Sequence, residues 1–308
     1  MNEKVRKVLK ITLINIVFLI FLVISFETYF CIKNTTFWNK KFNGFGYLLK
    51  KEKFENKFND DFKKEVRKPQ GLKYKKKPIL FLGCSNAYGQ FLEEEETLSY
   101  KISKKAKRPV YNWAYPAWGI QHAYYIIQNM PKIQPEPEYV FYVFINDHLR
   151  RMYMNCFIED YAENLQYKLK DGKLEKIDNR SNIFDNSYFL VNLKKLFIYF
   201  YKKSENSQNL FLNYVYQLND EVKTLYPHSK FVILVFEHNN KKKKGKLQYK
   251  LMEELQKNRI NVVFSSKITD VDFSEDKYRL PKEKDSFRHP NALTWDIVSD
   301  ALIKEFDL

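Results

Sequence analysis

Short apolar runs alternate with longer amphipathic runs from residue 78 to the end of the chain, and this alternation constrains the fold more than any other feature. The apolar runs have the length and the β-branched or aromatic composition of buried strands. The expected strands are Ile79–Leu82, Tyr139–Ile145, Lys230–Phe236 and Ile260–Phe264, and the expected helices are Thr97–Lys107, Gln121–Met130, Lys246–Lys257 and Asn291–Phe306. Continuously apolar strands separated by helices predict an α/β fold with a parallel sheet covered on both faces.

The alternation is interrupted between Asp147 and Lys230, which predicts an insertion at about residues 148–229. Within it, Asp171-Gly172 lies between alternating flanks and predicts a two-residue hairpin turn. The stretch Tyr188–Tyr216 is rich in Phe, Tyr and Leu. It predicts two helices packed on the core, with an aromatic wall for a sugar or acyl group, or a face resting on a bilayer, as alternatives.

An apolar segment near the amino terminus predicts a membrane helix. Ile11–Phe26 contains no charged side chain, and with its flanks it approaches the roughly 20 residues that span a bilayer. Four basic residues precede it, which suits a cytoplasmic amino terminus and an extracytoplasmic location for the domain that follows. A cleaved secretory signal has a similar pattern, but no small-x-small site follows Ser25, which favours a retained signal anchor over residues 1–32.

Positive charge is concentrated beside this segment. The 308-residue chain has a formal net charge of +16, of which +12 falls in residues 1–77. Residues 33–77, rich in Lys, Asn and Phe, therefore predict a basic juxtamembrane tether or a loosely packed collar, and residues 78–308 predict the globular domain. Because the globular part is nearly balanced in charge, we expect the membrane as a partner and no nucleic acid.

The cysteines do not indicate a metal or disulfide site. Cys31, Cys84 and Cys156 have neither paired spacing nor a cluster of other metal-binding residues around them. We therefore expect no disulfide framework, no metal and no cofactor.

Open α/β sheets place their sites at the carboxyl ends of strands, and reactive side chains occur at four such ends. The first strand runs into Gly83-Cys84-Ser85, which puts a serine at a strand-to-helix turn. A nucleophile suits this location because nearby backbone N–H groups can stabilise an oxyanion, although the same pattern is typical of a helix cap. Gly119, at the second end, can bring its N–H against a ligand or serve as an ordinary turn glycine.

The third and fourth ends supply further polar groups. Asn146 follows the strand Tyr139–Ile145, where its amide can donate to an oxyanion or form an Asx turn. Arg150 and Arg151 follow shortly after and predict a solvated pair, with binding of an acidic glycan as the alternative. Before the last helix, Asp285 and His289 offer an imidazole base with a carboxylate nearby to orient it.

These four segments, in this order, resemble the SGNH/GDSL hydrolase superfamily, in the style of its single-span, membrane-anchored bacterial members. The resemblance covers roughly residues 78–306 and implies a three-layer, flavodoxin-like fold. It implies that Ser85 is the nucleophile and His289 the general base. It also implies an oxyanion hole formed by the Ser85 N–H, Gly119 and Asn146.

Two positions depart from the family pattern. Phe144 occupies a position where the family usually has glycine, which narrows the expected pocket. The triad acid usually stands three residues before the histidine, where this chain has Ser286. Asp285, one residue further back, is therefore the expected acid.

The resemblance implies a membrane-anchored serine esterase or O-acetyltransferase that acts on acyl esters, expected to be acetyl esters, of cell-envelope polysaccharide. Water resolves the acyl-serine in an esterase and a sugar hydroxyl resolves it in a transferase, and the sequence does not separate the two. Members of this style sometimes work beside a multi-span membrane-bound acyltransferase, which is a further expected partner. A non-catalytic glycan-binding or assembly protein and a lipid-directed esterase are the alternatives.

Overall fold

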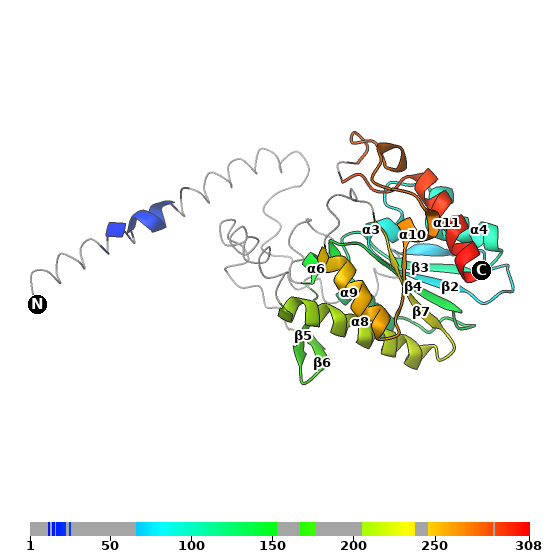
Figure 1. Cartoon of the computed structure of the whole chain (residues 1–308), viewed down its shortest axis with the longest axis horizontal. Helices are drawn as coiled ribbons and strands as arrows, with labels where there is room; N and C mark the ends of the chain where they lie inside the picture. The colour runs from blue at the N-terminus through cyan, green and yellow to red at the C-terminus, as the bar shows by residue number, and fades with distance from the viewer. Residues whose placement is uncertain are drawn as a thin grey trace, which may run out of the picture. The chain divides into compact units, whose positions relative to one another are not determined.

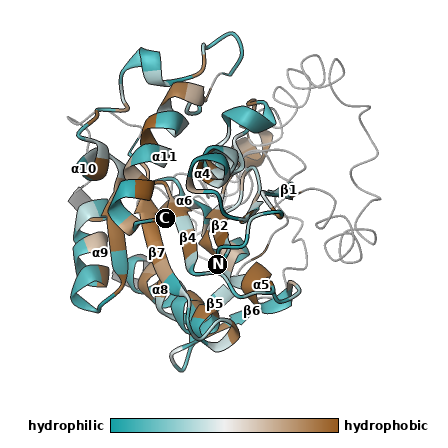
Figure 2. Ribbon diagram, turned by 90° about the vertical axis from the view of Figure 1, so that its right-hand side faces the viewer, coloured by the Kyte–Doolittle hydropathy of each residue, from teal (hydrophilic) through white to brown (hydrophobic). Residues whose placement is uncertain are grey.

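The computed structural model describes residues 66–152, 165, 167–176, 205–237, 246–285 and 287–308, together with ten positions between 12 and 25. The described part contains a six-stranded sheet in the order β1-β3-β2-β4-β7-β8 (Figure 1). Its strands are β1 Arg67–Gln70, β2 Ile79–Gly83, β3 Val110–Ala114, β4 Tyr139–Phe144, β7 Lys230–Val235 and β8 Asn261–Phe264. Figure 2 shows the central strands as mostly hydrophobic, as expected for a sheet covered on both faces.

The parallel sheet predicted from the sequence is confirmed. β3, β2, β4, β7 and β8 run parallel, and their order along the sheet is 2-1-3-4-5 in chain order, which is the flavodoxin order. β2 lies between β3 and β4, so the chain leaves these three neighbouring strands at the same edge. The segments that follow them are therefore brought together by the topology.

Helices cover both faces of the sheet. α4 (Leu98–Ala106) packs on α11 (Ala292–Phe306), and both contribute to a core with Phe141 and Val143 of β4. Successive side chains of a strand point to opposite faces of the sheet, so Phe144 lies on the other face, where it contacts Phe211 of α8 (Glu205–Leu225). α5 (Ile120–Asn129) and α9 (Lys246–Lys257) pack on α8. The described domain therefore has three layers.

The remaining elements are short. They are α3 Ser85–Tyr88, η3 Glu94–Glu96, α6 His148–Arg151, β5 Tyr167–Lys170, β6 Lys173–Lys176, α10 Ser265–Thr269 and η6 Asp276–Tyr278.

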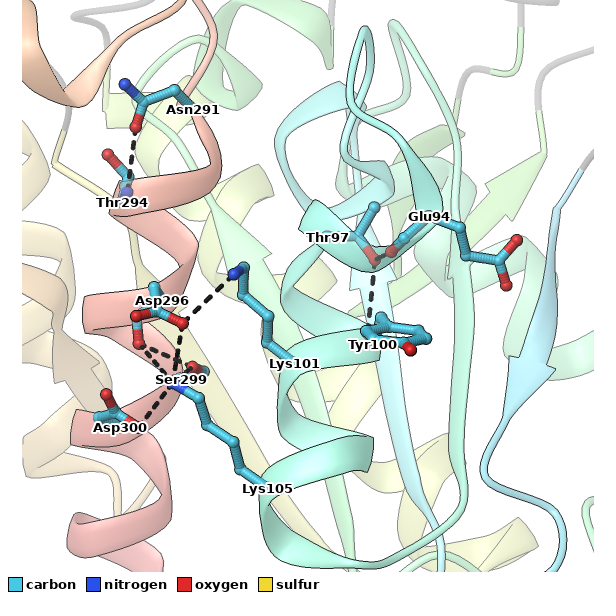
Figure 3. Close-up of polar contacts among 10 residues, drawn as sticks. All are labelled: Glu94, Thr97, Tyr100, Lys101, Lys105, Asn291, Thr294, Asp296, Ser299 and Asp300. Carbon is cyan, nitrogen blue, oxygen red and sulfur yellow. Dashed lines mark hydrogen bonds and ion pairs between the residues drawn. The ribbon is translucent and has the colours of Figure 1, made fainter.

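Ion pairs join α4 to α11 (Figure 3). Lys101 Nζ lies 3.2 Å from an Asp296 carboxylate oxygen, and Lys105 Nζ lies 2.7 Å from one of Asp300. Exposed pairs of this kind contribute little individually, but here they accompany an apolar interface. Since α11 begins shortly after His289, this interface fixes the position of the chain at that residue.

The predicted hairpin is confirmed, because β5 and β6 pair antiparallel around Asp171-Gly172. The predicted insertion at 148–229 also contains α8, which lies between β4 and β7 in the chain and covers the sheet as their crossover helix. The prediction therefore assigned a helix of the basic fold to the insertion. Residues 188–204 of the aromatic-rich stretch lie outside the described residues.

The predicted tether is wrong at its carboxyl end. Arg67–Gln70 forms β1, which pairs antiparallel with β3 at the edge of the sheet. The Arg67 guanidinium donates hydrogen bonds to the Tyr88 and Gly89 carbonyls, at 2.6 and 2.9 Å. This strand has no apolar alternation because it lies at an edge and is held by backbone pairing and arginine, which explains why the pattern did not predict it.

The described positions between 12 and 25 are helical and exposed. Among the residues that the structure describes, no helix combines the length and the apolar character needed to cross a membrane. The signal anchor over residues 1–32 stays a prediction, because most of that segment lies outside the described residues.

Candidate active site

Ser85 is the first residue of α3, and a single residue, Cys84, separates it from the end of the buried strand β2. The turn requires glycine at position 83, where φ is 151° and an added Cβ would lie 3.1 Å from the Val143 carbonyl oxygen. Ser85 itself is 4% exposed. Its backbone N–H belongs to the first turn of α3, where amides have no carbonyl partner four residues earlier.

His289 lies 204 residues further along the chain, and its Nε2 is 2.7 Å from the Ser85 hydroxyl oxygen. The backbone on both sides of this histidine is fixed. The His289 carbonyl accepts from the Leu280 N–H at 2.9 Å, and the Asn291 side chain caps α11 by accepting from the Thr294 N–H at 3.1 Å. The fold thus brings the two predicted reactive groups into direct contact.

Asp285 completes a chain of hydrogen bonds. Its Oδ2 lies 2.7 Å from His289 Nδ1, and the residue is 3% exposed. Both carboxylate oxygens also accept backbone N–H groups, from Phe287 to Oδ1 at 3.0 Å and from His289 to Oδ2. Because a carboxylate only accepts, Nδ1 carries the imidazole proton, which leaves Nε2 to accept from the Ser85 hydroxyl.

Burial lowers the pKa of His289 below its ordinary value of 6.5. The Asp285 carboxylate acts in the opposite direction and raises this pKa, and the charge of Arg151 lowers it. The net direction is downward, so the imidazole is neutral at neutral pH. A neutral imidazole can accept the serine proton, as a general base must.

The two other predicted oxyanion donors, Asn146 and Gly119, have different surroundings. Asn146 follows β4, is exposed, and makes no side-chain hydrogen bond with any residue that the structure describes. The Gly119 N–H, in contrast, donates to Nδ1 of the buried His122 at 3.1 Å. Donation to an oxyanion from Gly119 would therefore require this hydrogen bond to be shared or broken. The sequence did not reveal the bond because nothing marks His122 as its acceptor.

Arg151 is a site residue whose role the sequence did not predict. The expectation of a solvated pair is wrong for this arginine, which is only 9% exposed. Its Nε lies 2.8 Å from an Asp147 carboxylate oxygen, and its guanidinium donates to the Trp118 carbonyl at 2.7 Å. The i,i+4 spacing from Asp147 was the available signal. Arg151 thereby joins the segment that holds Asn146 to the segment that holds Gly119.

The described ranges contain no group of three or more His, Cys, Asp or Glu residues arranged to hold a metal ion. Cys84 is buried beside the candidate nucleophile as a free thiol. The groups assembled here are those of a serine–histidine–aspartate triad at the carboxyl edge of a flavodoxin-like sheet.

No family model and no curated protein matches the chain. Among solved structures it is similar to a lipolytic protein of the G-D-S-L family from Desulfitobacterium hafniense, at 10% identity and a TM-score of 0.44, covering 74% of this chain and 99% of that one. It is also similar to a family 2 carbohydrate esterase with a carbohydrate-binding domain from Myceliophthora fergusii, at 12% identity and 0.44, covering 75% and 66%. A family 3 carbohydrate esterase from Clostridium thermocellum is similar at 13% identity and 0.42, covering 75% and 94%.

Proposed function

We propose that this protein is a serine ester hydrolase or O-acyltransferase that works through an acyl-serine on Ser85. One observation supports this most directly: the continuous contact from the Ser85 hydroxyl to His289 Nε2 and from His289 Nδ1 to Asp285, at 2.7 Å for each link. This arrangement is the triad that activates a serine hydroxyl for attack on an acyl carbon.

In the first half of the proposed reaction, His289 accepts the Ser85 proton while the serine oxygen attacks the ester carbonyl carbon. The resulting oxyanion accepts hydrogen bonds from the Ser85 N–H and the Asn146 amide. When the tetrahedral intermediate collapses, the bond to the alcohol oxygen breaks and His289 gives its proton to that oxygen. The products are the free alcohol and an acyl-serine.

In the second half, His289 accepts a proton from the incoming nucleophile, which attacks the acyl-serine. Water releases a carboxylic acid, whereas a sugar hydroxyl yields a new ester. His289 then returns the proton to the serine oxygen. Both outcomes use the same residues, so we propose both, and incubation with and without a sugar acceptor separates them by product.

We further propose acyl esters of cell-envelope polysaccharide, acetyl esters above all, as substrates. The resemblance of the four sequence segments and the apolar segment at Ile11–Phe26 support this proposal. The proposal also includes a single-pass membrane anchor, a catalytic domain on the extracytoplasmic side and a multi-span acyltransferase as partner. The non-catalytic alternative rested on loss of the triad acid, and the contact between Asp285 and His289 disfavours it.

The test is covalent labelling of the full chain with a fluorophosphonate, followed by mass spectrometry of the peptides. The proposal expects the adduct on the Ser85 peptide, together with hydrolysis of an acetyl ester. Ser85→Ala should lose both, with a fall in turnover of up to about 10⁶ as in other serine triads. Ser274→Ala is the matched control, because this serine makes no side-chain hydrogen bond with described residues. Undiminished turnover in Ser85→Ala would refute the proposal.

A further inference from the structure

Two phenylalanines are exposed beside the candidate general base. From residue 66 onward, the exposed large hydrophobic side chains that the structure describes are Leu72, Phe91, Leu169, Phe287 and Leu293. The two aromatic members of this set both pack on His289. The ring centroids of Phe91 and His289 are 5.8 Å apart, and those of Phe287 and His289 are 6.4 Å apart, both edge-on.

Phe91 is held in a backbone conformation that disfavours its residue type. It is the third residue of a turn closed by a hydrogen bond from the Leu92 N–H to the Gly89 carbonyl at 3.1 Å, and its φ is +66°. This position usually takes glycine or asparagine, because a Cβ is strained at positive φ. A bulky side chain kept here despite the strain, and 45% exposed, is the kind of outlier that occurs at functional sites.

Arg67 fixes this turn from the edge strand β1. Its guanidinium donates to the Gly89 carbonyl at 2.9 Å and to the Leu92 carbonyl at 3.1 Å, on either side of Phe91. It also lies over the Tyr88 ring, 4.7 Å from the centroid. The Phe91 backbone is therefore held in place while its ring remains open to solvent.

Phe287 is fixed by the triad acid itself. Its N–H donates to Asp285 Oδ1 at 3.0 Å, and it stands two residues before His289. The next residue, Arg288, has φ +58° and is ion-paired to Asp276 at 2.7 Å. Phe287 is nevertheless 70% exposed. Hydrogen bonds and the neighbouring ion pair hold its backbone, while its ring stays in contact with solvent.

The proton transfers of the proposed mechanism indicate which half of the ester lies near these rings. His289 must give its proton to the departing alcohol oxygen, so that oxygen comes within hydrogen-bond reach of the imidazole. Groups that pack on the imidazole are therefore beside the alcohol half of the substrate. Phenylalanine rings offer no hydrogen bonds, so they select an alcohol that has an apolar face.

We propose that Phe91 and Phe287 form a subsite for the alcohol half of the ester, which is a pyranose whose C–H face lies against the two rings. This inference rests on the proposed function and deepens it, because it names the part of the substrate that the protein recognises. The acyl half lies on the other side of the reacting carbon and makes no contact with these rings.

The test separates binding from turnover. The full chain with Ser85→Ala is titrated with a monoacetylated methyl pyranoside, and Phe91→Gly or Phe287→Ala is then added to the same background. We expect each substitution to weaken binding about tenfold, the scale of one well-placed aromatic contact. Glycine relieves the strain at position 91, so this variant should fold. Leu72→Ala is the matched control, because Leu72 is likewise an exposed apolar residue, at 61%, and lies between β1 and β2 in the chain, outside the segments that hold Ser85 and His289.

Kinetics on the serine-containing protein complete the test. With the acyl group held constant, Phe91→Gly should raise KM for the acetylated pyranoside about tenfold, and kcat/KM should fall more for the acetylated pyranoside than for ethyl acetate, which has no pyranose ring to bind. Three results would overturn the subsite: no binding of the pyranoside by the Ser85→Ala protein, an equal fall in kcat/KM for both esters, or unchanged affinity of both variants for the pyranoside. Pyranoside binding that depends on the rings, in a protein that neither hydrolyses nor transfers an acyl group and takes up no fluorophosphonate on Ser85, refutes the proposed function and leaves a pyranose-binding site at the two rings.

Discussion

Nδ1 of His289 lies 2.7 Å from Oδ2 of Asp285, four residues earlier in the chain. The turn between them is closed by backbone hydrogen bonds to the same carboxylate, from the N–H groups of Phe287 and His289. The Asp285 carboxylate therefore holds the imidazole ring of His289 and also the loop that carries it.

Asp285→Asn should lower kcat by about 10⁴, because the amide disfavours the tautomer in which Nε2 accepts the serine proton. The amide keeps one of the two acceptor oxygens, so one of the backbone N–H groups of Phe287 and His289 loses its acceptor and the folding of the variant is checked beside its activity. The measurement is steady-state hydrolysis of an acetyl ester, with circular dichroism as the control for folding. A loss of less than tenfold would contradict the role of this carboxylate.

The pH dependence of kcat/KM should follow His289. Protonation of the imidazole removes the general base, so activity falls as the pH drops through the pKa of this group. Because burial lowers that pKa, the acidic limb should have its midpoint below 6.5 and neutral pH should lie on the plateau. Asp285→Asn removes a group that raises the pKa and should move the limb to still lower pH. A wild-type midpoint above 6.5 contradicts this prediction.

Asn146→Ala should lower kcat by about 10², because it removes one donor to the oxyanion and leaves substrate binding largely intact. KM should change by less than about threefold, since the donor acts mainly on the charge that develops in the transition state. Asn129→Ala, on the exposed end of α5, is the matched control, because its amide donates to the Tyr125 carbonyl and to no other residue that the structure describes. A rise in KM at constant kcat would assign Asn146 to substrate binding instead.

Arg151→Gln should reduce the free energy of unfolding by about 2 kcal/mol, because it breaks the ion pair between a buried arginine and the partly exposed Asp147. It should also lower kcat, since Arg151 joins the Asn146 segment to the Trp118 carbonyl beside Gly119. Urea denaturation gives the first quantity. Arg151→Lys retains the charge, but an ammonium group cannot contact Asp147 and the Trp118 carbonyl at the same time as a guanidinium does. The free energy of unfolding of this variant should therefore lie between those of the wild type and Arg151→Gln. Wild-type stability in both variants would show that the contact is dispensable.

Much of the site could be predicted from the chain because the parallel sheet determines where residues meet. Buried strands have continuous apolar runs, and the carboxyl ends of adjacent parallel strands lie at one edge. Ser85 and Asn146 follow β2 and β4, which are neighbours in the sheet, so local pattern and topology together placed them. The predictions failed where a residue's environment comes from distant chain segments, as with the burial of Arg151 by the Trp118 loop.

By itself, the sequence determined the strands and helices, the parallel sheet and the four segments that hold reactive groups, because periodicity and strand ends are local properties. Only the tertiary structure decided that Asp285 reaches His289, that the Gly119 N–H is bound to His122, and that Arg67 belongs to the sheet. It alone also left Phe91 and Phe287 exposed beside the imidazole. The physical reason is that burial depends on which distant segments pack together, and that a hydrogen bond needs a particular backbone and side-chain conformation. Residue spacing specifies neither, even for the short-range pairs His289–Asp285 and His122–Gly119.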